Sequence, residues 1–348
     1  MARVTVQRIA DELGISKFAV SRALSGKHGV SDQTRRLVVE KAAELGYVVR
    51  TPRTQIASKG LEIIFHDPDV AHRELWVEVQ AGVQQEGARQ GFATAVRLTD
   101  DAGLPGRLKE STAGFILVGP QEPAMIEAAR GTGLPCVRIG PPVSALDPMD
   151  QVGIADLEAM SVVAQHLLDL GHRSFVYVHG QAGYPGRTER LHGFAAAIAQ
   201  VEGTSLRELT FPEDSRAGDF RALMDALLSD DFQPTAFFCG NDNVAVTVIS
   251  ELLHLGIKVP EQVSVMGFAD YPIATLMVPR LSTVRAPHRE MGAAAVQIIK
   301  SRLAELSPAD RLPPMRLNLV GTLVARDSTA EVCSRTRFWS AVEPREMS

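Results

Sequence analysis

Four side chains near the start of the chain could read the edges of DNA base pairs: Lys17, Phe18, Ser21 and Arg22. Lysine and arginine can donate hydrogen bonds to O6 and N7 of guanine, and an aromatic ring can press against a thymine methyl group. Their apolar neighbours recur at helical spacing, so these four side chains are expected to point away from the packed side. An exposed phenylalanine at the start of a helix adds nothing to stability, which favours a contact with DNA.

Residues 4–47 must position these side chains, and their pattern predicts three short helices. Thr5, Ser16 and Ser31 can cap the first turns, because a hydroxyl oxygen accepts a hydrogen bond from a free backbone N–H. Gly14 can end the first helix. Two short helices joined by a tight turn and backed by a third make a helix-turn-helix, whose second helix enters the major groove. The alternative is a small helical subdomain that binds no DNA; spacing, caps and charge together favour DNA.

The charge of the chain is unevenly distributed. Residues 1–59 contain eleven Lys and Arg against five Asp and Glu, which gives +6. The whole chain carries −5, so the remainder carries −11. A basic head on an acidic body is typical of a protein whose head binds a polyanion. A merely solvated head would not explain this asymmetry.

The remaining motifs exclude several classes of site. Cys136, Cys239 and Cys333 are far apart, and the chain has no CxxC and no His/Cys metal spacing, so we expect reduced thiols, no metal and no cofactor. We find no nucleophile elbow, P-loop, zinc-protease or dinucleotide motif, so we expect no catalytic residues and no enzyme. A polar helix follows Met1 directly and no apolar run could span a membrane, which predicts a cytoplasmic protein with no membrane partner.

Beyond the head, a polar and basic stretch at residues 48–60 is expected to be a linker. Apolar strand-like runs then alternate with helical patterns. Such alternation predicts parallel sheets with helices on both faces. Two open sheets would form two lobes, with a ligand in the crevice at the carboxyl ends of the strands. The expected fold class is therefore an all-α helix-turn-helix head on an α/β two-lobed core like that of periplasmic binding proteins.

The head resembles the DNA-binding head of the lactose/galactose repressor family. The likeness lies in V-T-V-x-x-I-A-x-x-L-G-I-S-x-x-x-V-S-R-A-L-S-G, followed by V-S-x-x-T-R and A-x-E-L-G-Y. The resemblance implies base-reading positions at Lys17, Phe18 and Arg22. It implies phosphate contacts at Thr5, Ser16, Ser21 and Thr34.

In this family the linker folds into a hinge helix when two chains meet on an operator, and a branched residue there wedges into the minor groove. The resemblance places Ile56 in that role. The sequence departs from the family's usual Y-x-P-N-x-x-A-R-x-L, since Pro52 lies where only a first helical turn would tolerate it. A flexible tether is the alternative.

The body resembles the same family and the related sugar-binding proteins. Matching stretches are GHR at 171–173, RLHGF at 190–194, PTAFFCGND at 234–242 and VSVMGF at 263–268. The resemblance implies that the chain crosses between lobes near residues 157, 287 and 320. The implied divisions are a head at 1–47, a hinge at 48–60, a core at 61–328 and a tail at 329–348, which we expect to be partly disordered. Within the core, one lobe would comprise about 61–157 and 288–319, and the other about 158–286 and 320–328.

The same resemblance implies a small-molecule effector between the lobes. Its candidate contacts are Trp76, Tyr184, Arg190, Phe238, Asn241 and Asp270. Trp76 could stack on a sugar or purine, although an ordinary core aromatic is the alternative. Arg190 could bind a hydroxyl pair, carboxylate or phosphate through its fork.

One departure bears on this effector. Where the family commonly has Asp after the Gly-aromatic pair, this chain has Ala269, with Asp270 next. A neighbour along a strand points elsewhere, so Asp270 cannot simply replace the missing acid. The departure predicts an effector other than the commonest hexoses, one that carries negative charge for Arg190, or no effector.

These observations together predict a sequence-specific transcriptional regulator of repressor type, bound as a homodimer to a near-palindromic double-stranded operator. An effector would shift it between two lobe arrangements. The competing hypothesis is a binding protein of transport or chemosensing that uses the same core. The basic head and the absence of a leader pattern argue against it.

Overall fold

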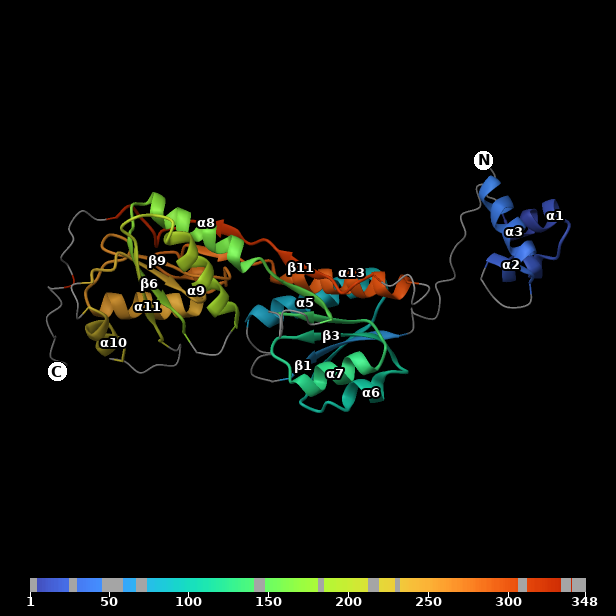
Figure 1. The fold of residues 1–348 in the computed structure, drawn as a ribbon, viewed down its shortest axis with the longest axis horizontal. Helices are drawn as coiled ribbons and strands as arrows, with labels where there is room; N and C mark the ends of the chain where they lie inside the picture. The colour runs from blue at the N-terminus through green and yellow to red at the C-terminus, as the bar shows by residue number, and fades with distance from the viewer. Residues whose placement is uncertain are drawn as a thin grey trace. The chain divides into compact units, whose positions relative to one another are not determined.

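The computed structural model describes residues 5–24, 30–45, 59–66, 74–140, 148–180, 185–211, 219–228, 232–305, 312–332 and 339. The chain forms two compact units, Met1–Gly60 and Leu61–Ser348. The first unit is the head and the second is the core (Figure 1). Three features predicted from the sequence lie outside the described residues: the hinge with Ile56, the side chain of Tyr184, and Cys333.

The head consists of three helices around a small apolar centre. They are α1 (Val6–Leu13), α2 (Lys17–Leu24) and α3 (Asp32–Glu44). Each helix contributes two buried side chains: Ile9, Ala10, Val20, Ala23, Val38 and Ala42. Gly14 ends α1 with φ of 63°, a conformation that favours glycine because it has no Cβ. The short turn that follows brings α2 back across α1.

One lobe of the core, called the N-lobe, is built on a six-stranded sheet in the order β11-β5-β4-β3-β1-β2. The pairs β1–β2, β3–β4, β4–β5 and β5–β11 are parallel. The strand bounds are β1 Gly60–Phe65, β2 Thr94–Leu98, β3 Thr112–Val118, β4 Cys136–Ile139, β5 Asp150–Ile154 and β11 Arg316–Leu319.

Helices cover both faces of this sheet. They are α5 (Glu74–Gln90) and α13 (His288–Ala304) on one face, and α6 (Leu104–Leu108) and α7 (Pro123–Gly131) on the other (Figure 1). Adjacent residues in β1 face opposite ways: Ile63 packs with Val79 and Val83 of α5, and Ile64 packs with Met125 of α7. This alternation explains why the strands are continuously apolar, since both faces are buried.

The second lobe, called the C-lobe, is built on a parallel four-stranded sheet in the order β7-β6-β8-β9. Val178 and Phe237 pack toward α10 and α11, while Tyr177 and Phe238 pack toward α8 and α9. The strand bounds are β6 Ser174–Val178, β7 Ser205–Leu209, β8 Ala236–Cys239 and β9 Ser264–Met266. The helix bounds are α8 Asp156–Asp169, α9 Pro185–Ile198, α10 Asp219–Leu227, α11 Asp242–His254 and α12 Ile273–Leu276.

The chain passes between the lobes three times. It leaves β5 for α8, leaves β10 (Thr283–Arg285) for α13, and leaves β11 for β12 (Thr322–Val324). β10 and β12 pair antiparallel beside the C-lobe sheet, and Ser282 and Arg285 form single bridges to Met266 and Ala269. These three short passages are called the crossings.

Asp270 pairs with two arginines that lie beside the second and third crossings. Its Oδ1 accepts a hydrogen bond from Arg326 Nη2 at 2.6 Å, and its Oδ2 accepts one from Arg285 Nε at 2.8 Å. Asp270 has φ of 60° and Ala269 has φ of 119°, and non-glycine residues rarely adopt such values. The backbone therefore turns sharply after β9, and this turn directs the carboxylate to the crossings.

The start of the C-terminal tail packs on the C-lobe. His172 Nε2 lies 2.9 Å from Ser264 Oγ and 3.1 Å from the carbonyl oxygen of Ala330. Burial lowers the pKa of His172 to about 4, so the ring is neutral at pH 7. Trp339 is buried against the ring of Phe237 and donates its indole N–H to the carbonyl of Pro234 at 3.0 Å. At these positions the tail is part of the packed core.

Two glycines allow α5 and α13 to cross with their backbones in contact. A Cβ added at Gly82 would lie 1.9 Å from the carbonyl oxygen of Arg289, and one added at Gly292 would lie 2.1 Å from that of Val79. The close crossing lets α13, which is distant in sequence, close the same sheet face as α5.

The predicted fold class is confirmed: a helix-turn-helix head is followed by an α/β core with two parallel sheets. Among the described residues, none of the helices combines the length and the apolar character needed to cross a membrane.

We predict that Gly82→Ala destabilises the core by about 3 kcal/mol or more, because a methyl group cannot fit against a backbone carbonyl and the two helices must separate. The matched control is Gly106→Ala in α6, where an added Cβ meets nothing within 4 Å. That change should be neutral or stabilise by about 0.5–1 kcal/mol. Denaturant unfolding followed by tryptophan fluorescence reports on the core, since both tryptophans, Trp76 and Trp339, are buried there. Equal unfolding midpoints for the two variants would contradict the close backbone contact of α5 with α13.

We further predict that Asp270→Asn destabilises the core by about 3–5 kcal/mol, because it leaves the nearly buried Arg326 without its carboxylate. Asparagine tolerates positive φ, so the backbone turn should persist. The control is Asp327→Asn, which breaks the pair with Arg280 at 2.7 Å, where both side chains are at least half exposed. That change should move the unfolding midpoint little, because solvent screens an exposed ion pair. The same fluorescence titration distinguishes the two variants, and a small effect of Asp270→Asn would show that the pairs do not hold the crossings.

Candidate nucleic-acid interface and effector cleft

The outer surface of α2 carries the side chains expected to face DNA. Phe18 is 67% exposed, and Lys17 and Ser21 are also exposed. The guanidinium carbon of Arg22 lies 5.1 Å from the centroid of the Phe18 ring, within range of a cation–π contact. The ring therefore orients the arginine, while Val20 and Ala23 on the opposite side of α2 are buried in the head. The surface of α2 therefore presents a hydrogen-bond donor, the Arg22 guanidinium, beside an apolar group, the Phe18 ring.

Hydroxyl groups cap the three helices of the head. Thr5 Oγ1 accepts from Arg8 N at 3.3 Å, and Ser16 Oγ accepts from Ala19 N at 3.1 Å. Ser31 Oγ accepts from Thr34 N at 3.2 Å and lies 2.8 Å from Thr34 Oγ1. A hydroxyl that accepts a capping bond can still donate its own hydrogen. The helix N-termini with these hydroxyls are therefore suited to bind phosphate groups.

Arg190 lies at the junction of the first crossing and the C-lobe. It comes from α9, and its Nη1 donates to Asp156 Oδ1 at 3.1 Å, while its Nη2 donates to the carbonyl of Gly240 at 3.1 Å. Its guanidinium carbon lies 4.1 Å from the centroid of the Phe268 ring. Nε is buried and has no hydrogen-bond partner among the described residues. A buried donor of this kind is costly unless something binds it.

Asp156 is the first residue of α8 and the partner of this arginine. Burial raises the pKa of Asp156 above its usual range, and the positive charge of Arg190 holds that rise back. Burial also raises the pKa of Glu189, and the neighbouring charge of Asp156 adds to the rise. This part of the core therefore holds two carboxylates beside one guanidinium.

Two aromatic rings stand near Arg190, those of Tyr271 and His288, with centroids 6.4 Å apart and planes inclined by 29°. Burial lowers the pKa of His288 to about 4, and the charge of Arg190 contributes. Burial raises the pKa of Tyr271, and Arg190 opposes that rise. Both rings are therefore uncharged at neutral pH, and each can donate or accept a hydrogen bond.

Asp242 holds Tyr271 in place. Its Oδ2 accepts from Tyr271 N at 2.7 Å, and its Oδ1 accepts from Thr283 Oγ1 at 2.6 Å. Asp242 is fully buried, which raises the pKa of its carboxyl group to about 6. The residue joins the start of α11, the turn after β9 and the second crossing.

A hollow of about 590 Å³, called the interlobe hollow, lies where these parts meet. It is lined from the N-lobe by Glu74, Val77 and Glu78 of α5, and from the C-lobe by residues 269–272. Residues 285–290 and two positions near the third crossing complete it. Tyr271 and His288 belong to its wall, so the hollow reaches the rings that stand near Arg190.

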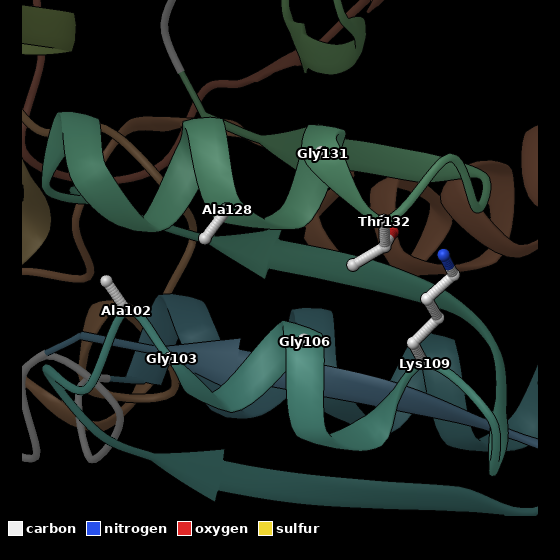
Figure 2. Close-up of a pocket in the computed structure, with 7 residues that line it drawn as sticks. All are labelled: Ala102, Gly103, Gly106, Lys109, Ala128, Gly131 and Thr132. Carbon is white, nitrogen blue, oxygen red and sulfur yellow. The ribbon is translucent and has the colours of Figure 1, made fainter.

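A second hollow lies between α6 and α7 of the N-lobe (Figure 2). Ala102 and Ala128 stand on its two sides, and Gly103, Gly106 and Gly131 supply backbone alone. Its polar side chains are Lys109 and Thr132, and the Thr132 hydroxyl donates to the carbonyl of Ala129. This lining offers few side chains that could bind a ligand.

The structure separates the predicted effector residues by role. Arg190 and Asp270 stand at the crossings, and Asp270 is held by two arginines. Trp76 is buried with the apolar residues of the N-lobe, and Phe238 is buried in the C-lobe between Tyr177 and Phe194.

Asn241 caps α11, since its side chain accepts from Val244 N at 2.9 Å.

Three residues near Arg190 were missed in the prediction from the sequence: Asp156, Tyr271 and His288. Asp156 and Tyr271 follow strands directly or closely, as ligand-binding residues in α/β folds do, and this position was the available signal.

Among the described residues, no group of His, Cys, Asp or Glu is arranged to hold a metal ion.

Comparisons with known proteins agree with this architecture. Residues 5–49 match the family described as bacterial regulatory proteins, lacI family, and residues 164–329 match a periplasmic binding protein-like domain. The chain is 30% identical to the HTH-type transcriptional regulator GntR of Pseudomonas aeruginosa, with 94% of this chain and 96% of that protein covered. It is 29% identical to the HTH-type transcriptional regulator MalR of Streptomyces coelicolor, with 92% and 95% covered.

Solved structures share the fold. The lac repressor dimer bound to operator and the anti-inducer ONPF matches with a TM-score of 0.64 at 21% identity, and covers 94% of this chain and 100% of that one. The transcriptional regulator CelR in complex with cellobiose matches with a TM-score of 0.65 at 23% identity and the same coverage. The relatives favour a regulator over a transport binding protein, because they share both head and core. The chain belongs to the lacI family of bacterial regulatory proteins and is a DNA-binding transcriptional regulator.

Proposed function

We propose that the protein acts as a homodimer that binds a near-palindromic operator. A small molecule bound between the lobes would change its affinity for this operator. One observation carries the DNA part: α2 exposes Phe18 and holds Arg22 beside it, while its other side is buried in the head. Lys17, Phe18 and Arg22 would read bases. Thr5, Ser16, Ser21 and Thr34 would contact phosphates, and Ile56 would wedge into the minor groove.

Dimerisation follows from the way such heads bind. One helix-turn-helix covers half a site, and two-fold symmetry doubles both contact area and specificity. Leu276 and Val278 are 77% and 89% exposed on the core, as apolar residues of an interface would be in a single chain. Binding of operator DNA implies a cytoplasmic location for the regulator.

The effector would bind where the lobes meet, against Arg190, Tyr271 and His288. The unpartnered Nε of Arg190 supports this position, and so do the two neutral rings that line the interlobe hollow. Trp76, Tyr184, Phe238, Asn241 and Asp270 would shape the site around them. We propose lobes at 61–157 with 288–319 and at 158–286 with 320–328, after a head at 1–47 and a hinge at 48–60. A ligand can shift the lobes only by its difference in affinity for their two arrangements.

The DNA part is tested with Arg22→Ala. Loss of a bidentate base contact should weaken operator binding by about 1–3 kcal/mol, and nonspecific binding should change little. The control is Arg36→Ala, which removes the same charge from an exposed position on α3. It should leave the ratio of operator to random-duplex affinity unchanged. Titrations of both variants against both duplexes at two salt concentrations separate the effects, and an unchanged ratio for Arg22→Ala would rule out its base-reading role.

The effector part is tested with Arg190→Leu. Arg190 lies in the core and not in the head, so this variant should retain operator affinity. Because the guanidinium is lost, it should no longer respond to any molecule that changes the operator affinity of the wild type. Screening sugars, sugar acids, sugar phosphates and nucleobases by thermal shift identifies such molecules, since a bound ligand raises the melting temperature. A full response in Arg190→Leu would place the effector elsewhere.

A further inference from the structure

Phe18 and Arg22 form a pair on the outer surface of α2. They lie four positions apart, so both side chains stand on the same face of the helix. The guanidinium carbon of Arg22 is 5.1 Å from the centroid of the Phe18 ring, and a ring at this distance attracts the charge through its π-system. The ring is nevertheless 67% exposed, so most of it remains open to whatever α2 contacts. The pair therefore presents a fork of N–H donors and an apolar surface side by side.

The two members of this pair can recognise different features of a base pair. The guanidinium fork donates hydrogen bonds to O6 and N7 of guanine. The Phe18 ring has no polar atom, so it cannot read the pattern of donors and acceptors in the major groove. The C5-methyl group of thymine is the apolar group that this groove displays. A methyl group is therefore the feature that the ring can distinguish.

The spacing of the pair limits where this methyl group can lie. The guanidinium carbon and the ring centroid are 5.1 Å apart, whereas neighbouring bases of one strand lie about 3.4 Å apart along the helix axis. When Arg22 holds a guanine, the ring therefore reaches the adjacent base pair. The buried side chains Val20 and Ala23 fix α2 on the head, so the two contacts must be made together.

We propose that the Phe18–Arg22 pair reads one two-base step, a guanine beside a pyrimidine that carries a C5-methyl group. Thymine carries this methyl group, cytosine lacks it, and 5-methylcytosine carries it at the same ring position. Methylation of a cytosine at this step therefore raises the affinity of the protein for its operator. This deepens the proposed function and rests on it, since it assumes that α2 lies in the major groove with Arg22 on a guanine.

The first test removes the methyl group alone. The probe is a duplex that the full-length wild type selects from a pool of random sequences, and each of its thymines is replaced in turn by uracil. At one thymine beside a guanine in each half-site, the change should weaken binding about fourfold, which is the effect of burying one methyl group. Phe18→Ala should bind the thymine and uracil duplexes equally, because the ring is lost.

The matched control for Phe18→Ala is Leu37→Ala, which removes a 51% exposed apolar side chain from α3 of the same head. It should keep the difference in affinity between thymine and uracil.

Phe18→Leu tests whether the two side chains act as one unit. Leucine retains an apolar contact but has no ring to orient Arg22. The preference for guanine over adenine at the adjacent position should therefore fall about threefold.

The second test adds the methyl group to cytosine. Cytosine in place of the sensitive thymine, with guanine opposite it, should weaken binding by the wild type. 5-Methylcytosine at the same position should bind about fourfold more tightly than cytosine. Phe18→Ala should bind the methylated and unmethylated duplexes equally, and a 5-methylcytosine placed outside the selected sequence should change nothing.

Any of four results would overturn the proposal. They are a wild type indifferent to uracil at every thymine, a thymine preference that persists in Phe18→Ala, an undiminished guanine preference in Phe18→Leu, and no gain from 5-methylcytosine in the wild type. Failure of the wild type to select any sequence from the pool would instead refute the proposed function. A selected operator that is bound equally well with thymine or uracil would refute this inference alone.

Discussion

Pairing of arginine with carboxylate at the crossings is the constraint on which the arrangement of the core depends. Asp156, which follows the first crossing, pairs with Arg190. Arg285, where the second crossing begins, and Arg326, just after β12, both pair with Asp270. Side chains that are charged and nearly buried keep their partners, because separating them leaves a charge in a medium that solvates it poorly. These pairs fix the course of the chain on the C-lobe side of the crossings.

The interlobe hollow, where the effector is proposed to bind, is lined by residues of the second and third crossings. The residue proposed to meet it, Arg190, also pairs with Asp156, the first residue of α8, so a molecule that binds the guanidinium would change this pair. Asp242 provides a second connection, because it holds the backbone of Tyr271 and the hydroxyl of Thr283 at the second crossing. A ligand at these rings, as proposed, would therefore act on the chain beside two crossings through single hydrogen bonds. Such contacts are what a two-state lobe movement requires.

The local pattern of apolar and polar residues was sufficient to predict much of the fold. It predicted much less of the candidate site. The predicted alternation of apolar strands with helices is present throughout the described core, because apolar periodicity depends on near neighbours. The outward face of α2 was predicted for the same reason. The pair of Asp156 with Arg190 joins residues 34 positions apart, and Tyr271 meets His288 only once α13 has crossed back. Periodicity contains no information about such long-range contacts.

Ala269 and Asp270 show how a one-residue change alters the role of an acid. Related chains commonly place the acid directly after the Gly-aromatic pair, and here it comes one position later. Successive side chains on an extended strand point to opposite sides, and the positive φ values of both residues turn the chain further. The carboxylate consequently turns toward Arg285 and Arg326 and accepts a hydrogen bond from each. Arg190 instead pairs with Asp156, the first residue of α8. In the proposed function, ligand recognition and lobe movement would therefore share this ion pair, because Asp156 directly follows the first crossing.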